Sequence, residues 1–444
     1  MKFLVLNGSP KGEYSITYHT VLYLQKKFPE HSFDVLHVGQ KIKSLEKDFS
    51  PALDAIKQAE ALLFSYPVYT FIAPCQLHRF IELMKEHGAD VSGKLATQVT
   101  TSKHFYDVTA HRYLQDNVQE MGMHFVRGLS ADMDDLTTEK GRQEAESWFR
   151  HVLWSAEKGY FEPWSPVVPG AAMPATVPEM PAGEKPGDVV IIADLRPEDN
   201  RLAAMVERFR AKLPYATRVV YLQEYPFRGG CLGCFRCAVS GKCVYKDGFD
   251  EYLRTKIQTA DAMVYAFTIR DHSMGSRFKM YDDRQFCNGH RTVTIGMPVG
   301  YLISGPYNQE HNLQMILEGR AQVGSNIFTG VATDEADTDA AIDRLADSLS
   351  YSLEHKNTGP QNFLGIGGMK IFRDLIYQMR GMMRADHKFF KSHGQYDFPQ
   401  KKWPMSLAMY LVGAMIANPK LHSKIGNQMN EGMVAPYKKV LEDS

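Results

Sequence analysis

The sequence has little cysteine and tryptophan, no excess of either charge, and no long apolar run. Six cysteines and four tryptophans occur among 444 residues, and 51 Lys and Arg residues balance 51 Asp and Glu residues. Because positive and negative charges balance, the net charge gives no reason to expect nucleic acid as a partner. The longest apolar run, at 405–417, is too short to cross a bilayer, so we expect no transmembrane segment. The opening MKFLVLNGSP lacks the pattern of a cleaved leader, so we expect a cytoplasmic protein.

The few cysteines are concentrated in one short stretch, GGCLGCFRCAVSGKC. Four of the six lie there, at Cys231, Cys234, Cys237 and Cys243. Without signs of secretion, such a cluster favours a metal centre or redox-active thiols over disulfides. Four thiolates suit a [4Fe–4S] cluster or a zinc ion, and thiols without metal are the third interpretation that the residues leave open. We expect the two remaining cysteines, Cys75 and Cys287, to have no metal role.

Strand-like and helix-like patterns alternate along most of the chain. In the first half we expect strands at 2–8, 32–38, 60–68, 94–102 and 123–131. In the second half we expect strands at 188–194, 218–223, 261–269, 294–305 and 326–334. Helical patterns lie between most of these strands. The alternation predicts an α/β fold, with parallel sheets covered by helices on both faces.

The two halves resemble each other and are separated by a proline-rich stretch. Residues from Ala59 align without gaps with residues from Ala260, over a strand, a loop and the start of a helix. This internal repeat predicts two tandem copies of one fold. Seven prolines between 163 and 186 exclude a helix or a central strand there. We therefore expect the following division: domains at 1–159 and 188–356, a linker at 160–187, and a helical extension at 357–444.

The extension is basic and rich in methionine. It holds twelve Lys and Arg residues against six Asp and Glu residues, a net charge of +6, and nine of the 22 methionines. Residues 367–390 have the pattern of an amphipathic basic helix. Three interpretations remain: a helical cap on the second domain, a homodimer seam, or a docking surface for a protein or a membrane.

Three loops at strand ends of the first half carry residues suited to a phosphate and a flat ring. NGSPK follows the first strand, Gly8 permits close backbone approach, and hydroxyls and a helix N-terminus follow at Ser15 and Thr17. Tyr66 and Tyr69 lie where the third strand ends, and Thr101 and Ser102 lie where the fourth strand ends. Ligands of open α/β sheets lie at these carboxyl ends. The alternative is an ordinary capped turn beside half-buried aromatic residues.

The motifs VLNGSPK, FSYPVYTFIAPCQLHRFIELM and QVTTS resemble those of NAD(P)H-dependent FMN reductases of flavodoxin-like fold. The half that holds the four cysteines resembles the iron–sulfur flavoproteins of the same superfamily. The resemblance covers residues 1–155 and 188–350 and implies two flavodoxin-like doubly wound parallel sheets in tandem. It implies that the FMN phosphate is held by Gly8, Ser9, Pro10, Ser15 and Thr17. It implies that the flavin ring is held by Tyr66, Pro67, Val68, Tyr69, Thr101 and Ser102, and a [4Fe–4S] cluster by Cys231, Cys234, Cys237 and Cys243.

The halves differ in what they keep of this pattern. In the second half, the loop in the place of NGSPK carries Asp194, Glu198 and Asp199, which would repel a phosphate. We therefore expect one FMN in the first half and one cluster in the second.

The expected function is that of an enzyme, an FMN-dependent oxidoreductase that moves electrons from NADH, NADPH or a ferredoxin-like donor to a small-molecule or protein acceptor. The alternative is a non-catalytic electron carrier or redox sensor that docks on a partner through the extension. A homodimer is compatible with both.

Overall fold

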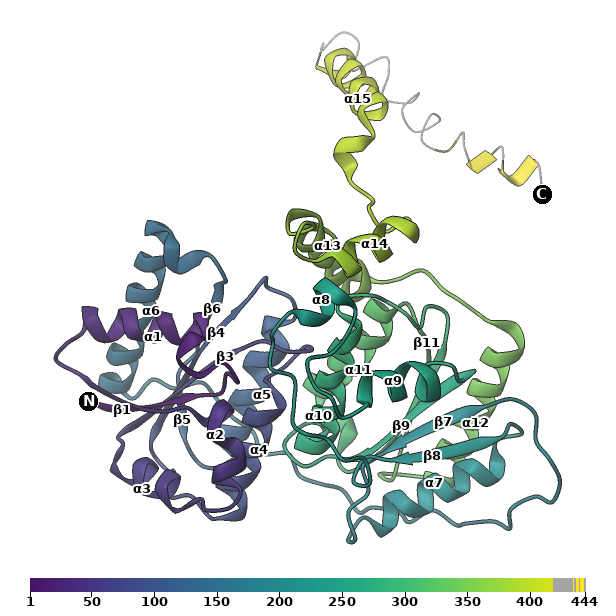
Figure 1. Cartoon of the computed structure of the whole chain (residues 1–444), viewed down its shortest axis with the longest axis horizontal. Helices are drawn as coiled ribbons and strands as arrows, with labels where there is room; N and C mark the ends of the chain where they lie inside the picture. Colours follow the sequence, from purple (N-terminus) through teal and green to yellow (C-terminus); the bar gives the residue numbers. More distant parts are fainter. Residues whose placement is uncertain (418–433, 435–436, 439, 443–444) are drawn as a thin grey trace. The chain divides into compact units, whose positions relative to one another are not determined.

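The computed structural model describes residues 1–417, 434, 437–438 and 440–442. The chain divides into two compact units, Met1–Phe389 and Phe390–Ser444. The first unit contains two parallel sheets (Figure 1).

The first sheet has the strand order of a flavodoxin-like fold. Its strands are β1 (Lys2–Asn7), β2 (Ser32–Leu36), β3 (Ala61–Pro67), β4 (Leu95–Ser102), β5 (His124–Phe125) and β6 (Leu129–Asp132). They are parallel, in the order β2-β1-β3-β4-β5, and β6 also pairs with β4. Strands β1, β3 and β4 are buried on both faces because helices cover both sides of the sheet, which explains their nearly continuous apolar sequences.

The strand expected at 123–131 is two short strands. Phe125 pairs with Ala96, and Leu129 pairs with Val99, so the outer strand has one residue more than β4 between the two pairings. A Cβ atom on Gly128 would collide with Gln98 of β4. The close approach of Gly128 and the extra residue together interrupt the strand, as at a β-bulge.

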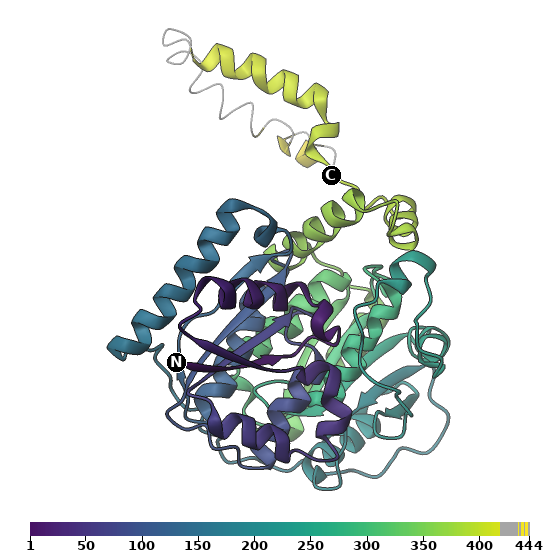
Figure 2. The same ribbon diagram turned by 60° about the vertical axis from the view of Figure 1, so that its left-hand side comes forward.

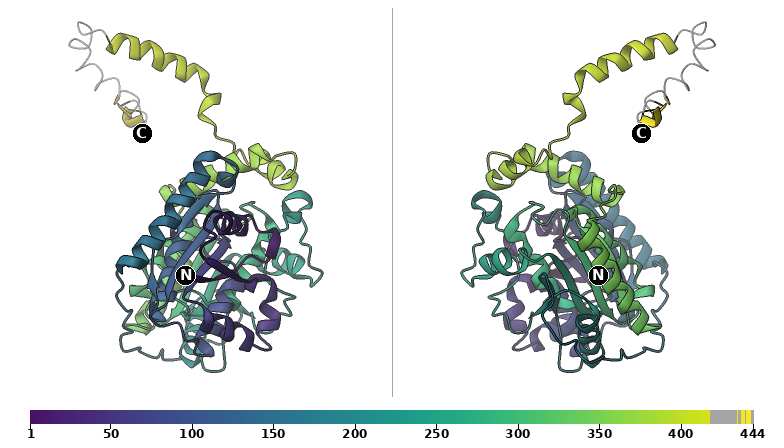
Figure 3. Two further views of the ribbon diagram at one scale, coloured as in Figure 1. Left: turned by 90° about the vertical axis from the view of Figure 1, so that its left-hand side faces the viewer. Right: turned by 90° about the vertical axis from the view of Figure 1, so that its right-hand side faces the viewer.

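Helices cover the first sheet on both faces. They are α1 (Ile16–Lys27), α2 (Val38–Leu45), α3 (Ser50–Gln58), α4 (Cys75–Glu86), α5 (Asp107–Glu120) and α6 (Glu139–Lys158). Helices α1 and α6 lie side by side on one face (Figures 2 and 3). Phe149 of α6 packs in the apolar cluster that also holds Val21 and Leu24 of α1. Thr138 caps α6 by accepting a hydrogen bond from the Gly141 amide, and Gly159 ends it in the left-handed conformation. No helix or strand lies between α6 and Val189, in agreement with seven prolines there.

The second sheet repeats the first. Its strands are β7 (Val189–Ala193), β8 (Thr217–Tyr221), β9 (Ala262–Thr268), β10 (Pro298–Ser304) and β11 (Ile327–Thr333). Their order, β11-β10-β9-β7-β8, is the order of the first sheet when both are numbered along their own half. The helices of this half are α7 (Asn200–Lys212), α8 (Arg236–Ser240), α9 (Phe249–Tyr252), α10 (Gly275–Arg284), α11 (His311–Gly324) and α12 (Thr338–His355). The predicted tandem of two flavodoxin-like folds is confirmed.

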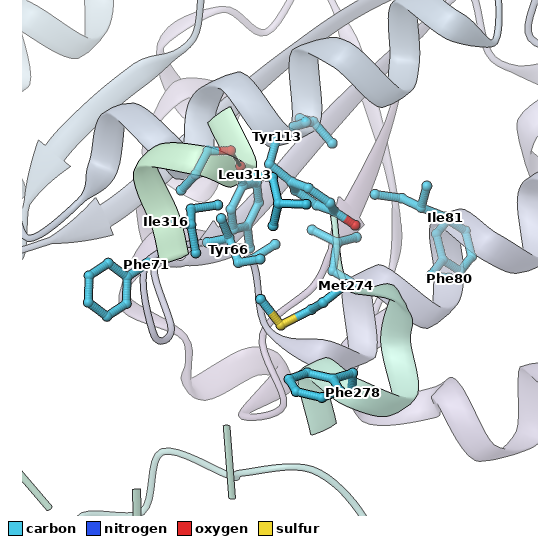
Figure 4. Packing of buried hydrophobic residues seen from close by; sticks show 14 of the residues in the cluster. Tyr66, Phe71, Phe80, Ile81, Tyr113, Met274, Phe278, Leu313 and Ile316 are labelled. Carbon is cyan, nitrogen blue, oxygen red and sulfur yellow. Dashed lines mark hydrogen bonds between the residues drawn. The ribbon is translucent and has the colours of Figure 1, made fainter. Parts of the chain in front are cut away.

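The two halves pack through equivalent helices. Helix α4 contacts α10, and α5 contacts α11; within each pair, both helices follow the same strand of their own half. One apolar core therefore runs through both halves and includes Tyr66, Phe80, Met274, Phe278 and Leu313 (Figure 4). Equivalent surfaces that meet in this way are typical of a two-fold dimer, so the tandem chain has the internal arrangement of a dimer.

The seam also contains buried charge. His78 Nδ1 of α4 lies 2.6 Å from Asp271 Oδ2 of the second half, and the Tyr113 hydroxyl donates to the same oxygen over 2.9 Å. All three side chains are fully buried or nearly so. Because leaving such groups unpaired costs free energy, these bonds favour one relative placement of the halves.

Among the residues that the structure describes, the extension forms three α-helices rather than one long basic helix. They are α13 (Phe363–Gln378), α14 (Arg384–Ser392) and α15 (Trp403–Ile416). The helix expected at 367–390 is divided between α13 and α14, with Gly381, a weak helix former, in the break. Helix α13 lies close to α11, because Gly365 approaches the Gln322 carbonyl oxygen and Gly368 approaches Val323. No helix among the described residues has the length and hydropathy needed to cross a membrane.

Candidate functional site

A cavity of about 210 Å³ lies at the carboxyl ends of the strands of the first sheet. Four parts of the chain form its walls: the strand-end loops of the first half, the cysteine segment of the second half, helix α13, and residues 284–290 at the end of α10 and directly after it. Eight of the eleven residues predicted to hold FMN line it: Ser9, Ser15, Thr17, Pro67, Val68, Tyr69, Thr101 and Ser102. All four cysteines of the motif line it as well. The structure therefore brings together two motifs that are more than 100 positions apart.

The other three predicted residues, Gly8, Pro10 and Tyr66, are not in the lining. Gly8 lies behind the loop, where a Cβ atom would come within 3.0 Å of Leu77. Tyr66 points into the core, because side chains alternate along β3, and its hydroxyl lies 2.5 Å from Gln98 Oε1. Complete burial raises the pKa of Tyr66 well above its ordinary value. Its observed contacts therefore belong to the seam between β3, β4 and α5.

The loop after β1 is organised around Asn7. Its amide nitrogen donates to the Gly12 carbonyl over 2.9 Å, and its amide oxygen accepts a hydrogen bond from the Ser9 backbone over 3.1 Å. Ser15 caps α1 by accepting a bond from the Tyr18 amide. The loop thus presents hydroxyls, and the N-terminus of a 12-residue helix, to the cavity. Asn7 begins the NGSPK motif at the end of the first strand, but the motif did not predict that its side chain organises the loop.

Two further features suit an anion at this end of the cavity. The Thr17 hydroxyl lies 2.6 Å from the Thr101 hydroxyl, which joins α1 to the end of β4. Lys11 lines the cavity, and its ammonium group lies 5.5 Å from the centre of the Phe235 ring. A phosphate would therefore meet hydroxyls, a helix N-terminus and a lysine, which are ordinary phosphate-binding groups.

The loop after β3 touches the cysteine segment. Thr70 and Phe71 have positive φ angles of 39° and 75°, and Tyr69 pairs with Ile72 in a tight reversal. This reversal turns Tyr69 toward Gly233, so closely that a Cβ atom on Gly233 would overlap the tyrosine hydroxyl. Burial, and then the charge of a Cys231 thiolate, raise the pKa of Tyr69 well above its ordinary value.

The cysteine segment wraps one wall of the cavity. Phe235 and Gly233 both have φ near 60°, which lets the segment reverse twice between Cys231 and Cys237. The Gly233 amide donates to the Cys231 sulfur over 3.4 Å. Burial first, and then Asp386 and the neighbouring thiols, raise the pKa of Cys237 to about 11.

These donors fit a metal in type but are not gathered around one. Four thiols share one cavity, and this donor set is that of an iron–sulfur cluster or of zinc. Among the residues that the structure describes, however, no three His, Cys, Asp or Glu side chains come together as a metal site. The geometry therefore lends the cluster no support, and the cluster stays a prediction.

The two remaining cysteines lie at the same seam. Cys75 is buried at the start of α4, and Gly230 approaches its sulfur so closely that a Cβ atom would overlap it. Cys287 lines the cavity, where burial raises its pKa to about 12 although Arg254 opposes the shift. All six cysteines of the chain thus surround the contact between the halves, which the spacing in the sequence did not reveal.

Helix α13 forms the third wall through Ile371, Phe372 and Leu375. The Phe372 ring stacks on Phe105, with a centroid distance of 4.4 Å and an interplanar angle of 27°. Its other neighbour is His290, whose Nδ1 lies 2.9 Å from Asp386 Oδ2. The extension therefore contributes apolar side chains to the site, and the only signal in the sequence was the helical pattern of these residues.

In the second half, the carboxylates of the equivalent loop are paired. Asp199 accepts hydrogen bonds from Arg270 over 2.6 Å and from the Thr268 hydroxyl over 2.9 Å. Asp194 lies 3.1 Å from Arg277. Burial raises the pKa of Asp194 despite this arginine. Side chains of the protein itself thus occupy the neighbourhood in which the first half offers a phosphate loop.

Comparison with known proteins finds a family match in the first half. Residues 1–134 match the model of the NADPH-dependent FMN reductase family. The predicted resemblance of the first half to these enzymes is confirmed over this range. No curated protein matches the chain.

Several solved structures show similarity to about a third of the chain. An NADH:FMN oxidoreductase is 18% identical, with a TM-score of 0.30, over 35% of this chain and 89% of its own. An NAD(P)H:quinone oxidoreductase from Methanothermobacter marburgensis is 14% identical, with a TM-score of 0.29, over 35% of this chain and 97% of its own. An FMN-dependent NADH-azoreductase from Bacillus anthracis, solved with FMN, is 13% identical, with a TM-score of 0.26, over 36% of this chain and 100% of its own.

Proposed function

We propose that the protein is an NAD(P)H-dependent oxidoreductase that holds one FMN in the cavity between its halves. The observation that carries the proposal is the shared lining of this cavity by the phosphate-type loop, the loops after β3 and β4, and the cysteine segment. The proposal assigns the flavin to domain 1–159 and the cysteine segment to domain 188–356. Bound FMN would supply hydride acceptance and exchange between two-electron and one-electron chemistry.

Different residues of the chain are proposed to bind the phosphate and the ring of FMN. Ser9, Ser15 and Thr17 are the proposed phosphate ligands, together with the N-terminus of α1. Residues 67–69 and 101–102 are the proposed contacts of the ring. In this proposal Gly8 and Pro10 shape the phosphate loop from behind. Phe105 and Phe372 exclude water from the site, which strengthens electrostatic contacts inside it.

We further propose that Cys231, Cys234, Cys237 and Cys243 hold a [4Fe–4S] cluster when iron and sulfide are supplied. Support comes from the number and spacing of the thiols, which share one cavity with the proposed flavin site. Because burial raises the pKa of Cys237 to about 11, this thiol is protonated at neutral pH. Cluster assembly must therefore release protons and should proceed faster as pH rises.

The test is purification and reconstitution without oxygen, followed by flavin, iron and sulfide analysis. We expect about one FMN and about four irons per chain. Ser15→Ala with Thr17→Val should lose FMN and keep iron, whereas Cys234→Ser with Cys237→Ser should lose iron and keep FMN. FMN without iron or sulfide in the reconstituted wild type would overturn the cluster alone. A chain that binds no FMN would overturn the whole proposal.

Titration with NADH, NADPH and dithionite under the same conditions identifies the donor. We expect bleaching of the flavin spectrum by at least one nicotinamide, and turnover when an acceptor is present. Reduction by dithionite or by a reduced ferredoxin, with negligible NAD(P)H oxidation, would indicate an electron carrier instead.

A further inference from the structure

Helix α15 is apolar and exposed. Its sequence is WPMSLAMYLVGAMI, and the exposed fractions of Trp403, Tyr410 and Leu411 are 68%, 80% and 62%. Met405, Leu407, Met409 and Met415 are also exposed. An apolar surface of this kind marks a contact with another molecule or a membrane.

The exposed apolar side chains point to every side of the helix. Successive residues of an α-helix are about 100° apart, so Trp403, Leu407 and Leu411 lie on one side, while Met405 and Met409 lie on the other. A protein partner that packs against one stripe would leave the opposite side in water. A lipid medium covers all sides at once.

The charges around the helix favour an anionic lipid surface. Residues 403–419 contain no charged side chain. Lys401 and Lys402 come directly before them and are exposed, and the next charges in the sequence are Lys420 and Lys424. Lys402 forms an exposed ion pair with Asp397, over 3.3 Å, which water screens. An apolar segment between lysines matches acyl chains beneath anionic headgroups.

The length of the helix decides whether it can cross a bilayer. Fourteen helical residues measure about 21 Å, whereas the hydrocarbon core of a bilayer is about 30 Å thick. The helix is therefore too short to cross the bilayer and can insert into one leaflet only. Trp403 and Tyr410 are the residue types enriched at the boundary between headgroups and acyl chains.

We propose that residues 401–416 bind the surface of an anionic lipid bilayer, with α15 inserted among the headgroups and upper acyl chains. The lysines attract the segment to the anionic surface, and burial of the apolar side chains among the acyl chains keeps it bound. This inference does not depend on the flavin or on the cluster.

The experiment is flotation of the full-length protein, as purified, with vesicles of phosphatidylcholine alone or with 30% phosphatidylglycerol. We expect the protein to float with the anionic vesicles. Leu407→Glu with Leu411→Glu should abolish flotation. The matched control, Met315→Glu with Tyr351→Glu, places two charges at exposed apolar positions of α11 and α12 and should float like the wild type. Unchanged FMN content and unfolding temperature in both double variants verify that the fold is intact.

Two further measurements separate lipid from other occupants. Lys401→Gln and Lys402→Gln should each weaken binding to anionic vesicles about fivefold, and added salt should remove this difference. Brominated lipids should quench tryptophan emission in the wild type but not in Trp403→Phe. If the protein floats with neither kind of vesicle, the proposal is wrong. The proposal would also fail if the wild type binds no vesicles and forms a dimer that Leu407→Glu with Leu411→Glu converts to a monomer. In that case a second copy of the chain covers the helix.

Discussion

Gly233 of the cysteine segment meets the hydroxyl of Tyr69, with no room for a Cβ atom between them. Tyr69 belongs to the first half, in the loop that we assign to the flavin ring, and Gly233 lies between two cysteines of the second half. This contact is the direct physical link between the two motifs. It also explains why a glycine with a φ of 60° occupies this position.

Gly233→Ala should therefore separate the cysteine segment from the tyrosine loop. The positive φ angle and the collision together should lower the free energy of unfolding by about 1–3 kcal/mol. Urea denaturation measures this loss. In the Tyr69→Phe background the loss should shrink, because the colliding oxygen is gone. Gly359→Ala, at a position with open space around it, is the control. Equal losses in both backgrounds would contradict the contact.

Thr17→Val should weaken FMN binding about tenfold, because one hydroxyl contributes roughly 1–2 kcal/mol to a phosphate contact. Thr101→Val should also weaken binding, since the two hydroxyls lie 2.6 Å apart and orient each other. The double variant should lose less than the sum of the single losses. Quenching of FMN fluorescence measures each affinity. Thr137→Val, at an exposed position away from the cavity, should bind FMN normally. Unchanged affinity for FMN in the two single variants and the double variant would show that these hydroxyls do not bind the phosphate.

The sequence predicted the fold well because its signals were local. Apolar strands and helical spacing each depend on a few neighbouring residues. The alignment of the segment from Ala59 with the segment from Ala260 shows that the pattern occurs twice, and together these signals predict two parallel sheets. The interrupted strand at 123–131 was missed because its cause, the approach of Gly128 to Gln98, is a contact across the sheet. The helix at 367–390 was predicted as one piece because the apolar spacing continues through its break.

The site was predicted in part for the same reason. Residues at strand ends, such as Ser9 and Val68, could be placed by topology alone. The direction of Tyr66 could not be predicted, because the sequence does not tell which of the two alternating faces of β3 turns toward the cavity. The contribution of Phe372 was also hidden, since nothing in the local sequence tells which surface a helix of the extension will cover.

Phe372→Ala should open the cavity without removing its phosphate site. Loss of the ring that stacks on Phe105 should admit water and oxygen, so reduced flavin should reoxidise in air several times faster. Stopped-flow absorbance after reduction with one equivalent of reductant measures this rate. Phe363→Ala removes an equally large ring that is 84% exposed on the same helix, and should leave the rate unchanged. Loss of FMN from the Phe372 variant would show that α13 holds the flavin rather than covers it.

His272 should make the seam between the halves sensitive to alkaline pH. Burial alone would lower its pKa. The Glu120 carboxylate of the first half, 3.4 Å from Nε2, and the Glu310 carboxylate of the second half, 2.9 Å from Nδ1, outweigh burial and raise the pKa to about 9. The protonated form thus stabilises the fold fully below the unfolded value of 6.5, and this contribution, on the order of 1–3 kcal/mol, is lost as pH rises toward 9. Urea unfolding at pH 6, 7.5 and 9 should show this fall in the wild type and not in His272→Gln. His151→Gln, at an exposed position on α6, should fall like the wild type; a fall of the same size in His272→Gln would assign the pH dependence to other groups.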